Sequence, residues 1–231
     1  MPPASPVPAD RRFDGLAEVY DRWEELTGDP VGDWLPGVLP GGATALDATC
    51  GSGRHALLLA ERYDDVLAVD LSADMIERAR AVRPHPRIRY VQGDLHDQRG
   101  RYDLVFTSAA LHDVPDLDRA LLHLRSLVAP GGTLIVVDIA ADGALRSGRA
   151  PRWTVRAAML RGLLGDLRRR DRHAWERYRL GTHPVWLAHL ASDDTPEREQ
   201  LRERCLRRLP GARDERLQYL HAFVWTAPAG G

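Results

Sequence analysis

The sequence has no lysine and very little cysteine. All 32 of its basic residues are arginine, and its two cysteines are Cys50 and Cys205. Two cysteines cannot build the disulfide framework that holds small secreted domains together, so we expect a protein of the cytoplasm. The absence of lysine, together with abundant alanine, glycine, proline and leucine, is typical of a GC-rich genome and says nothing about function.

Long apolar runs and net charge are also missing. The longest apolar runs, such as residues 56–60 and 134–137, are far shorter than the ~20 residues that a membrane helix needs. The formal net charge of −1 argues against bulk electrostatic attraction to nucleic acid or to an anionic membrane, so we expect neither as a partner. Residues 1–11 are rich in proline and alanine without the apolar stretch of a secretion signal, and we expect them to form a disordered arm.

What the chain does contain is an alternation of strands and helices. Its 231 residues, 44% of them hydrophobic and 28% charged, suffice for one large α/β domain. From residue 44 onward, short apolar segments typical of strands alternate with amphipathic helical segments. The predicted strands are residues 44–49, 66–70, 88–91, 102–107 and 133–138. Strands that are apolar in their centres and separated by helices predict a parallel sheet covered on both faces.

Capping residues and apolar stripes mark the helices of this region. We expect Ser72 and Asp116 to cap two of them, because short polar side chains accept hydrogen bonds from the first helical N–H groups. The spacing places Val82 on the inner face of the first helix and Val128 on that of the second. Pro130-Gly131-Gly132 is expected to end the second helix.

The two ends of the chain carry further helical patterns. A first amphipathic helix is expected over residues 11–26, and Thr195-Pro196-Glu197 is typical of the start of a last helix, with proline at the first helical position. Residues 216–220 and 222–226 suggest a terminal hairpin. The inner faces of helices between residues 140 and 193 are predicted at Trp153, Ala157, Leu160, Leu164, Trp186 and Leu190.

Polar residues fall where the predicted strands end, which is where open parallel sheets bind their ligands. The segment Asp47-Ala48-Thr49-Cys50-Gly51-Ser52-Gly53 follows the first strand, and its glycines let the backbone approach a ligand at a helix N-terminus. Residues 51–56 also match the dinucleotide pattern G-x-G-x-x-A, with Asp70 19 residues after Gly51. This match does not separate a nicotinamide-dependent oxidoreductase from other proteins that bind a nucleoside.

Two acids at later strand ends have both a binding and a structural interpretation. Asp70 can accept both hydroxyls of a ribose, or it can be the acid that begins a helix. Asp94, in Gly93-Asp94-Leu95, can accept an exocyclic amine while Leu95 packs on a purine, or it can be a solvated turn residue. Residues 108–113 follow the fourth strand, and residues 127–134 lead into the fifth.

Taken in this order, the segments resemble the class I S-adenosylmethionine-dependent methyltransferases over roughly residues 12–138. The resemblance implies an α/β fold: a Rossmann-like, doubly wound, mostly parallel seven-stranded sheet with a C-terminal antiparallel hairpin and a helical cap. It implies a single domain over residues 12–231. Its parts would be an N-terminal lid helix (12–42), a cofactor-binding core (43–138), a cap insertion (140–193) and a closing helix with hairpin (195–227).

The resemblance also implies roles for single residues toward S-adenosyl-L-methionine. Asp70 would hold the ribose, Asp47 would organise the glycine turn near the amino-acid end, and Tyr20 would close over the cofactor as a lid or simply belong to its helix's apolar stripe. Thr49 departs from the glycine usual in the family; it would crowd the methionyl carboxylate or add a hydroxyl contact to it. The implied cofactor-binding residues are Tyr20, Asp47, Thr49, Gly51, Gly53, Asp70, Leu71, Met75, Asp94, Leu95 and Ala109.

Methyl transfer needs chiefly alignment and exclusion of water, and a general base is useful only for some acceptors. The best-placed candidates are His112 and Asp113 after the fourth strand; the alternative for His112 is a packing residue beneath the cofactor. His55 is interpreted as a local structural group. A helix N-terminus lowers the pKa of a thiol, but we interpret Cys50 as structural, as in the family. No metal site is predicted.

The acceptor should be chosen by residues 140–193 and the first helix. Trp153, Trp175, Tyr178 and Trp186 can stack on a planar substrate or can hold a small helical cap together. The arginines around residues 168–172 lie among acids, and a solvated helix face explains them better than a nucleic-acid site. We therefore expect a methyltransferase for a small-molecule acceptor, which can be aromatic, in bacterial specialised metabolism, acting as a monomer or homodimer. The alternative is a member of the same fold that binds the cofactor without transferring methyl.

Overall fold

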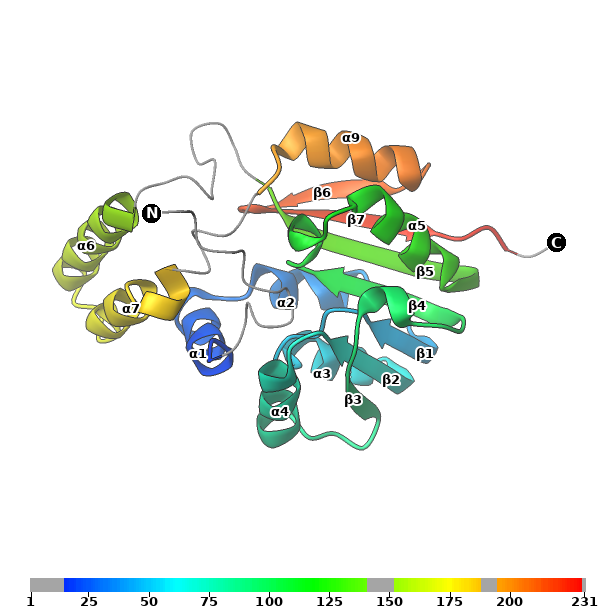
Figure 1. Cartoon of the computed structure of the whole chain (residues 1–231), viewed down its shortest axis with the longest axis horizontal. Helices are drawn as coiled ribbons and strands as arrows, with labels where there is room; N and C mark the ends of the chain where they lie inside the picture. The colour runs from blue at the N-terminus through cyan, green and yellow to red at the C-terminus, as the bar shows by residue number, and fades with distance from the viewer. Residues whose placement is uncertain (1–14, 141–151, 188–194, 230–231) are drawn as a thin grey trace, which may run out of the picture.

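The computed structural model describes residues 15–140, 152–187 and 195–229, apart from the side chains of residues 152–154. Seven strands form one sheet in the order β3-β2-β1-β4-β5-β7-β6 (Figure 1). β1 to β5 pair in parallel, and β7 pairs antiparallel with both β5 and β6. The strands are β1 (Gly42–Asp47), β2 (Tyr63–Asp70), β3 (Ile88–Gln92), β4 (Tyr102–Ser108), β5 (Val128–Ile139), β6 (Arg213–Leu217) and β7 (Leu220–Thr226). This confirms the predicted Rossmann-like, doubly wound sheet with a closing hairpin.

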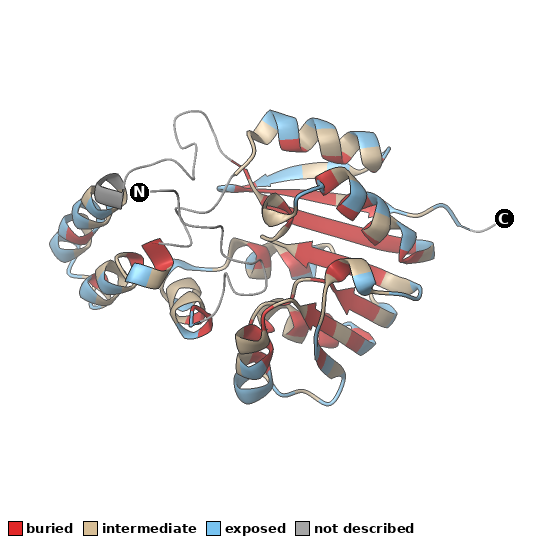
Figure 2. Ribbon diagram, viewed as in Figure 1, coloured by how far each residue is buried: buried red, intermediate tan, exposed pale blue. Residues whose placement is uncertain are grey.

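Helices cover both faces of the sheet, as the apolar strands predict. Leu104 and Phe106 of β4 face a core shared with α2, α3 and α4, whereas Val105 faces a core shared with α5 and α9. Figure 2 shows the sheet as the buried centre of the molecule. The helices are α1 (Ala17–Thr27), α2 (Pro30–Trp34), α3 (Arg54–Ala60), α4 (Ala73–Val82), α5 (Leu117–Ser126), α6 (Arg152–Arg168), α7 (Ala174–Gly181) and α9 (Arg198–Arg208). Short 3-10 turns are η2 (Leu35–Gly37), η3 (Leu95–Asp97) and η4 (Leu111–Asp113).

The predicted caps are present, but two predicted inner-face residues are not where we expected them. Ser72 accepts from Met75 N at 3.4 Å, and Asp116 accepts from Arg119 N at 3.0 Å. Val82 ends α4 and is exposed, because only the earlier turns of this helix reach the sheet. Val128 lies beyond the end of α5 and is already the first residue of β5.

Pro130-Gly131-Gly132 does not end a helix but forms an irregularity inside β5. Tyr102 pairs with Val128 whereas Leu104 pairs with Thr133, so β5 carries extra residues opposite β4 at this point. Gly131 has a φ of +76°, and a Cβ on Gly132 would lie 2.9 Å from the carbonyl oxygen of Asp103. The glycines therefore allow a bulge that brings two backbones close together.

The ends of the chain differ from prediction at helix boundaries. α1 begins at Ala17 rather than near residue 11, and α9 begins at Arg198, with Glu197 rather than Thr195 before its first turn. The terminal hairpin is present, but its turn lies inside the predicted first strand (216–220). The turn is made by Gln218, which has a φ of +55°, and Tyr219. The expected arm at residues 1–11 lies outside the described residues.

The cap helix α6 is turned differently from the prediction. Leu160 and Leu164, predicted on its inner face, are 47% and 48% exposed, whereas Leu163 is 7% exposed. The buried side packs on α7, where a Cβ on Gly181 would lie 2.5 Å from the sulfur of Met159. The side chain of Trp153 and residue Leu190 lie outside the described residues. Within the described ranges, no helix is both long and apolar enough to cross a bilayer.

Candidate active site

The carboxyl ends of β1, β2, β4 and β5 bring the predicted polar residues to one edge of the sheet. The strand order changes direction between β1 and β4, since the chain runs outward through β2 and β3 before it returns to β4. Ligands of open α/β sheets bind at such a switch point. Asp47 ends β1 and Asp70 ends β2. The predicted position of the site is thus set by topology.

Asp70 ties the glycine turn to the end of β2. Its two carboxylate oxygens accept from Gly51 N at 2.8 Å and from Ser72 N at 2.9 Å. Burial raises the pKa of Asp70, although the two backbone N–H groups oppose this shift. Because each carboxylate oxygen can accept a second hydrogen bond, Asp70 retains capacity for ribose hydroxyls. Both interpretations of Asp70, helix-terminal acid and ribose ligand, are therefore compatible with the same geometry.

Glycine is present at positions 51 and 53 of the turn for two different structural reasons. Gly51 has a φ of +52° and nothing within 4 Å of where a Cβ would stand, so the backbone is open on that side. Gly53 has a φ of +84°, and a Cβ there would lie 2.7 Å from the ring of Tyr90. Gly51 thus leaves room for a ligand, whereas Gly53 is required by packing.

Asp47 is a buried acid whose carboxylate oxygens have no hydrogen-bond partner among the described residues. Burial raises the pKa of Asp47 to about 7, with the neighbouring His55 opposing the shift. An unpaired buried carboxylate is costly unless a cation or donor reaches it. Asp47 therefore fits the cationic amino group of an amino-acid moiety.

Thr49 uses its hydroxyl within the protein. Its Oγ1 lies 2.9 Å from Oγ1 of Thr107 and accepts from Ser108 N at 3.2 Å. These contacts join the turn after β1 to the end of β4. The Thr49 side chain thus has a structural partner in a turn where the family usually has glycine.

The predicted adenine-side residues gather at the ends of β2 and β3. Met75 and Leu95 are buried, and Leu71 is half-buried. Asp94 accepts from His96 N at 2.8 Å and so caps η3, as in its structural interpretation. Its second carboxylate oxygen has no hydrogen bond to any described residue.

His112 pairs with an acid that the sequence analysis missed. Its Nδ1 lies 2.7 Å from Oδ1 of Asp138, a fully buried residue near the end of β5, whereas its Nε2 is 3.8 Å from Asp113. Of the two acids near His112, Asp138 rather than the predicted catalytic candidate Asp113 is within hydrogen-bond distance. Asp138 is an acid near the end of an apolar strand, and this position in the sequence could have identified it as a candidate. Ala109, just before η4, has a φ of +51°.

Comparison with known proteins decides what kind of site this is. Residues 46–136 match a family described as methyltransferase domain. An uncharacterized methyltransferase of Mycobacterium bovis is 33% identical over 190 residues, which cover 79% of this chain and 86% of that relative. The chain is a class I S-adenosylmethionine-dependent methyltransferase. The comparison thus decides against the nicotinamide-dependent oxidoreductase that the glycine pattern had left open.

Other relatives and solved structures agree with this assignment. Trans-aconitate 2-methyltransferase of Deinococcus radiodurans is 35% identical over 121 residues, covering 51% of this chain and 46% of that relative. A putative methyltransferase of Haloferax volcanii, solved with the Trm112 activator, covers 97% of this chain and 99% of its own, at a TM-score of 0.67 and 16% identity. DhpI in complex with SAH covers 96% of this chain and 94% of its own, at a TM-score of 0.63 and 18% identity. The cofactor of the methyltransferase is S-adenosyl-L-methionine.

Two predicted residues of the methyltransferase have clear surroundings. Tyr20 on α1 is half-buried with its ring 5.8 Å from that of Trp186, and Trp23 lies 5.4 Å from the same ring. The charge of Glu24, together with burial, raises the pKa of Tyr20 well above its ordinary value. Burial likewise raises the pKa of Cys50, so its thiol is protonated and suits the structural role that we expected.

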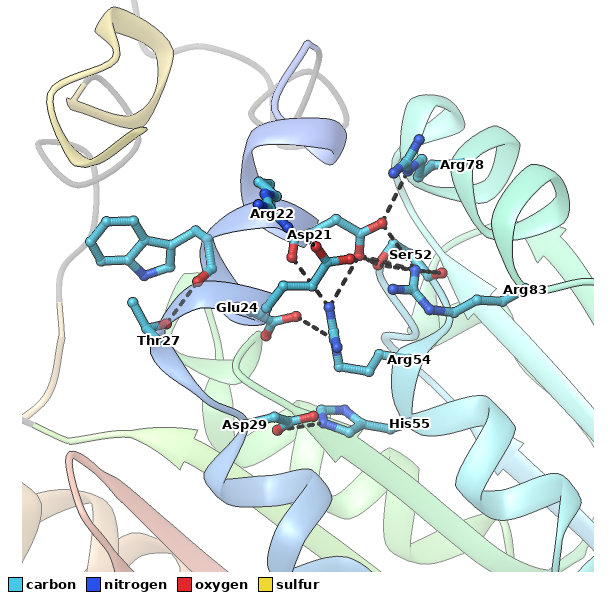
Figure 3. Close-up of polar contacts among 12 residues, drawn as sticks. Asp21, Arg22, Glu24, Thr27, Asp29, Ser52, Arg54, His55, Arg78 and Arg83 are labelled. Atoms are coloured by element: carbon cyan, nitrogen blue, oxygen red, sulfur yellow. Dashed lines mark hydrogen bonds and ion pairs between the residues drawn. The ribbon is translucent and has the colours of Figure 1, made fainter. Parts of the chain in front are cut away.

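Polar contacts between α1, α3 and α4 were not predicted. Asp21 is 1% exposed and accepts from Ser52 Oγ at 2.5 Å, Arg78 Nε at 3.0 Å and Arg83 Nη1 at 3.0 Å (Figure 3). Arg54 Nη2 donates to the backbone oxygen of Asp21 at 3.2 Å. We call Asp21, Ser52, Arg54, Arg78 and Arg83 the Asp21 cluster. Nearby, His55 lies 3.2 Å from Asp29, consistent with its interpretation as a local structural group.

The remaining aromatic residues of the cap behave differently from one another. Trp186 packs on α1, as described above, whereas Trp175 is exposed and stacks on Tyr178 with ring centroids 5.4 Å apart. Arg169, in the exposed turn directly after α6, pairs with Asp166 at 2.8 Å. The arginine run is exposed, but it lies at the end of α6 and in the turn that follows rather than along a helix face, because α6 ends at Arg168.

Proposed function

We propose that this methyltransferase methylates a small-molecule acceptor that gives up a proton, with His112 as the general base and Asp138 as the residue that orients it. The observation that carries the proposal is the 2.7 Å contact between Nδ1 of His112 and Asp138. The contact fixes the orientation of the imidazole, and we infer that Nδ1 donates to Asp138 while Nε2 is the ring nitrogen that takes the proton of the acceptor. Asp138 takes the orienting role in this proposal, and the predicted candidate Asp113 is the second acid near His112, 3.8 Å from its Nε2.

The cofactor site is proposed along the strand ends. S-adenosylmethionine supplies, when bound, a methyl group already activated on a sulfonium sulfur. Asp47 would meet the amino-acid end, Asp70 the ribose, and Asp94 with Leu95 the adenine. The full proposed set is Tyr20, Asp47, Thr49, Gly51, Gly53, Asp70, Leu71, Met75, Asp94, Leu95 and Ala109. The unpaired carboxylate of Asp47 and the open side of Gly51 support this fit.

The acceptor class is proposed from the relatives and from the aromatic residues near α1. The names of the relatives include trans-aconitate 2-methyltransferase and 2-phytyl-1,4-naphtoquinone methyltransferase, both of which refer to small molecules. Tyr20, Trp23 and Trp186 form an aromatic cluster where α1 meets the cap. We propose a planar acceptor in bacterial specialised metabolism, and a cytoplasmic enzyme working as one domain over residues 12–231 with the lid, core, cap and closing parts expected above.

Variants of three residues test the proposed base. His112→Ala is expected to lower kcat by about 10²-fold or more, because it removes the general base. Asp138→Asn should also lower kcat, since an amide at this position can donate to Nδ1 and reverse which ring nitrogen carries the proton. Asp113→Asn is the matched control and should leave kcat nearly unchanged. The rates are measured as production of SAH with a panel of phenols, hydroxylated aromatics and carboxylic acids.

Calorimetry with SAH shows whether each variant still binds the cofactor. Full activity in His112→Ala, or an equal loss in Asp113→Asn and Asp138→Asn, contradicts the assignment of the base. A protein that binds SAH but methylates no acceptor in the panel supports the alternative of a cofactor-binding member that does not transfer methyl.

A further inference from the structure

The Asp21 cluster joins the first helix to the turn that we assign to the cofactor. Ser52 lies between Gly51 and Gly53, and its hydroxyl donates to the carboxylate of Asp21. A single guanidinium nitrogen, Arg83 Nη1, lies 3.0 Å from both carboxylate oxygens of Asp21 and 2.9 Å from the carbonyl oxygen of Ser52. The helix and the turn are therefore held by the same donor.

The carboxylate of Asp21 balances the positive charge of the arginines in the cluster. Arg54, Arg78 and Arg83 all lie within salt-bridge distance of this one buried carboxylate, at 3.7, 3.0 and 3.0 Å. Burial by itself favours the neutral acid, but the hydrogen bonds from Arg83, Ser52 and Arg78 outweigh it and lower the pKa of Asp21. Without the carboxylate, three cationic groups would remain close together, with Glu24 paired to only one of them, Arg54, at 3.0 Å.

The position of Asp21 in the chain gives the cluster a functional consequence. Asp21 follows Tyr20 directly, and Tyr20 is the residue proposed to close over the cofactor. Glu24 of α1 also reaches the start of α3, where it pairs with Arg54, the residue directly after Gly53, at 3.0 Å. The ion pairs of Arg22 with Glu25 and Glu176 join half-exposed groups and involve no residue of the glycine turn. Figure 3 shows the side chains from α3 and α4 converging on Asp21 from the side of the turn.

We propose that Asp21 is a positioning residue for the cofactor: through Ser52 and Arg83 it fixes α1, and with it Tyr20, over the glycine turn. The helix and the turn are then held together, and the cofactor leaves only when the contact between them opens. The inference rests on the proposed cofactor site, because it takes Gly51 and Tyr20 as the parts that face the ligand.

The test compares two acids of the same helix. Asp21→Asn keeps the shape of the side chain but removes its charge, whereas Glu25→Gln removes the charge of an exposed ion pair and is the matched control. SAH association and dissociation are followed by stopped-flow tryptophan fluorescence. We expect Asp21→Asn to raise the SAH dissociation rate about tenfold, and Glu25→Gln to leave it unchanged. An unchanged dissociation rate in Asp21→Asn overturns the proposal.

A double-variant cycle separates positioning from a general loss of structure. Tyr20→Ala alone should also speed SAH dissociation. If Asp21 acts through Tyr20, adding Asp21→Asn to Tyr20→Ala should have little further effect, because the two residues act as a unit. Fully additive effects, or a loss of thermal stability with no change in dissociation rate, overturn the proposal.

A variant of Asp70 distinguishes failure of this inference from failure of the proposed site. Asp70→Ala should weaken SAH binding whatever the role of Asp21, because it removes the charged acceptor assigned to the ribose. If Asp70→Ala weakens binding and Asp21→Asn does not, the cofactor site stands and the positioning role is wrong. If neither variant weakens binding, both are wrong.

Discussion

Asp21 and Asp47 are both buried acids near the same turn, and their surroundings shift them in opposite directions. Asp21 receives hydrogen bonds from Ser52 and two arginines, and its pKa is lowered despite burial. Asp47 has no partner among the described residues, and burial raises its pKa to about 7. Ionised Asp21 therefore stabilises the fold, whereas ionised Asp47 destabilises it until a cationic ligand binds.

Asp47 makes stability depend on pH in the protein without cofactor. Its pKa is higher in the folded than in the unfolded chain, so the folded state binds more protons between about pH 4 and pH 7 and stability falls as the pH rises through this window. We expect Asp47→Asn to be more stable than the wild type at pH 7, with the advantage growing by up to about 1.4 kcal/mol per pH unit. Chemical denaturation between pH 5 and pH 8 measures this difference.

The exposed acid Asp64 on β2 supplies the control for this experiment. Asp64→Asn removes the same charge from an exposed position, so its pH profile gives the effect of the change in net charge alone. If the advantage of Asp47→Asn is constant between pH 5 and pH 8, or follows the profile of Asp64→Asn, Asp47 does not carry the proton that we assign to it. SAH, which has a cationic amino group, should reduce the advantage.

At the scale of elements, α6 shows what helical periodicity leaves undecided. Leucines occur on two adjacent stripes of this helix, and a stripe that contains Leu160 and Leu164 has good helical spacing. The structure buries Leu163 of the neighbouring stripe, and half-buried Met159 on the same side lies against Gly181 of α7. Periodicity gives the helix and its candidate faces, but only the position of a neighbouring element selects the buried one.

The two leucines provide a direct test of how α6 packs. Leu163→Ala should lower the free energy of unfolding by about 2–3 kcal/mol, because it removes buried apolar contacts. Leu160→Ala, the matched change on the exposed stripe, should cost less than about 0.5 kcal/mol. Urea denaturation measures both. Equal costs, or a larger cost for Leu160→Ala, would mean that α6 is rotated from the orientation described.

The short element η4 near the site likewise shows that sequence alone does not determine which residues meet. His112 and Asp113 are adjacent in sequence and both lie on η4, but the partner of His112 comes from β5. The parallel pairing of β4 with β5 brings these strand ends together across 26 residues of sequence. A single sequence shows which residues follow strands, but not which two strand ends face one another.

At the scale of the whole molecule, the C-terminal hairpin completes the core of the seven-stranded sheet. β7 pairs with β5 over seven residue pairs, from Thr133 with Thr226 to Ile139 with Leu220. Phe223 on β7 is fully buried against the core that includes α5 and α9. β7 is therefore part of the structure that carries Asp138.

This arrangement predicts that hairpin and sheet unfold together. Phe223→Ala should lower the free energy of unfolding by about 3–5 kcal/mol in one cooperative transition. Tyr219→Ala, at the exposed turn of the same hairpin, is the control and should have a small effect. Tryptophan fluorescence and far-UV circular dichroism should give coincident curves. A separate early transition would show that the hairpin is not integrated into the core.

The sequence by itself determined the class of fold, the alternation of strands and helices, and the residues that follow each strand. Apolar strand centres, capping residues and glycine at the first strand end are local properties, so Asp47, Gly51 and Asp70 could be selected without a structure. The tertiary structure decided which groups meet: His112 with Asp138, Asp21 with Ser52 and Arg83, and α6 with α7. These contacts join distant segments, and their geometry depends on strand order, register and helix rotation, none of which leaves a local mark in the chain.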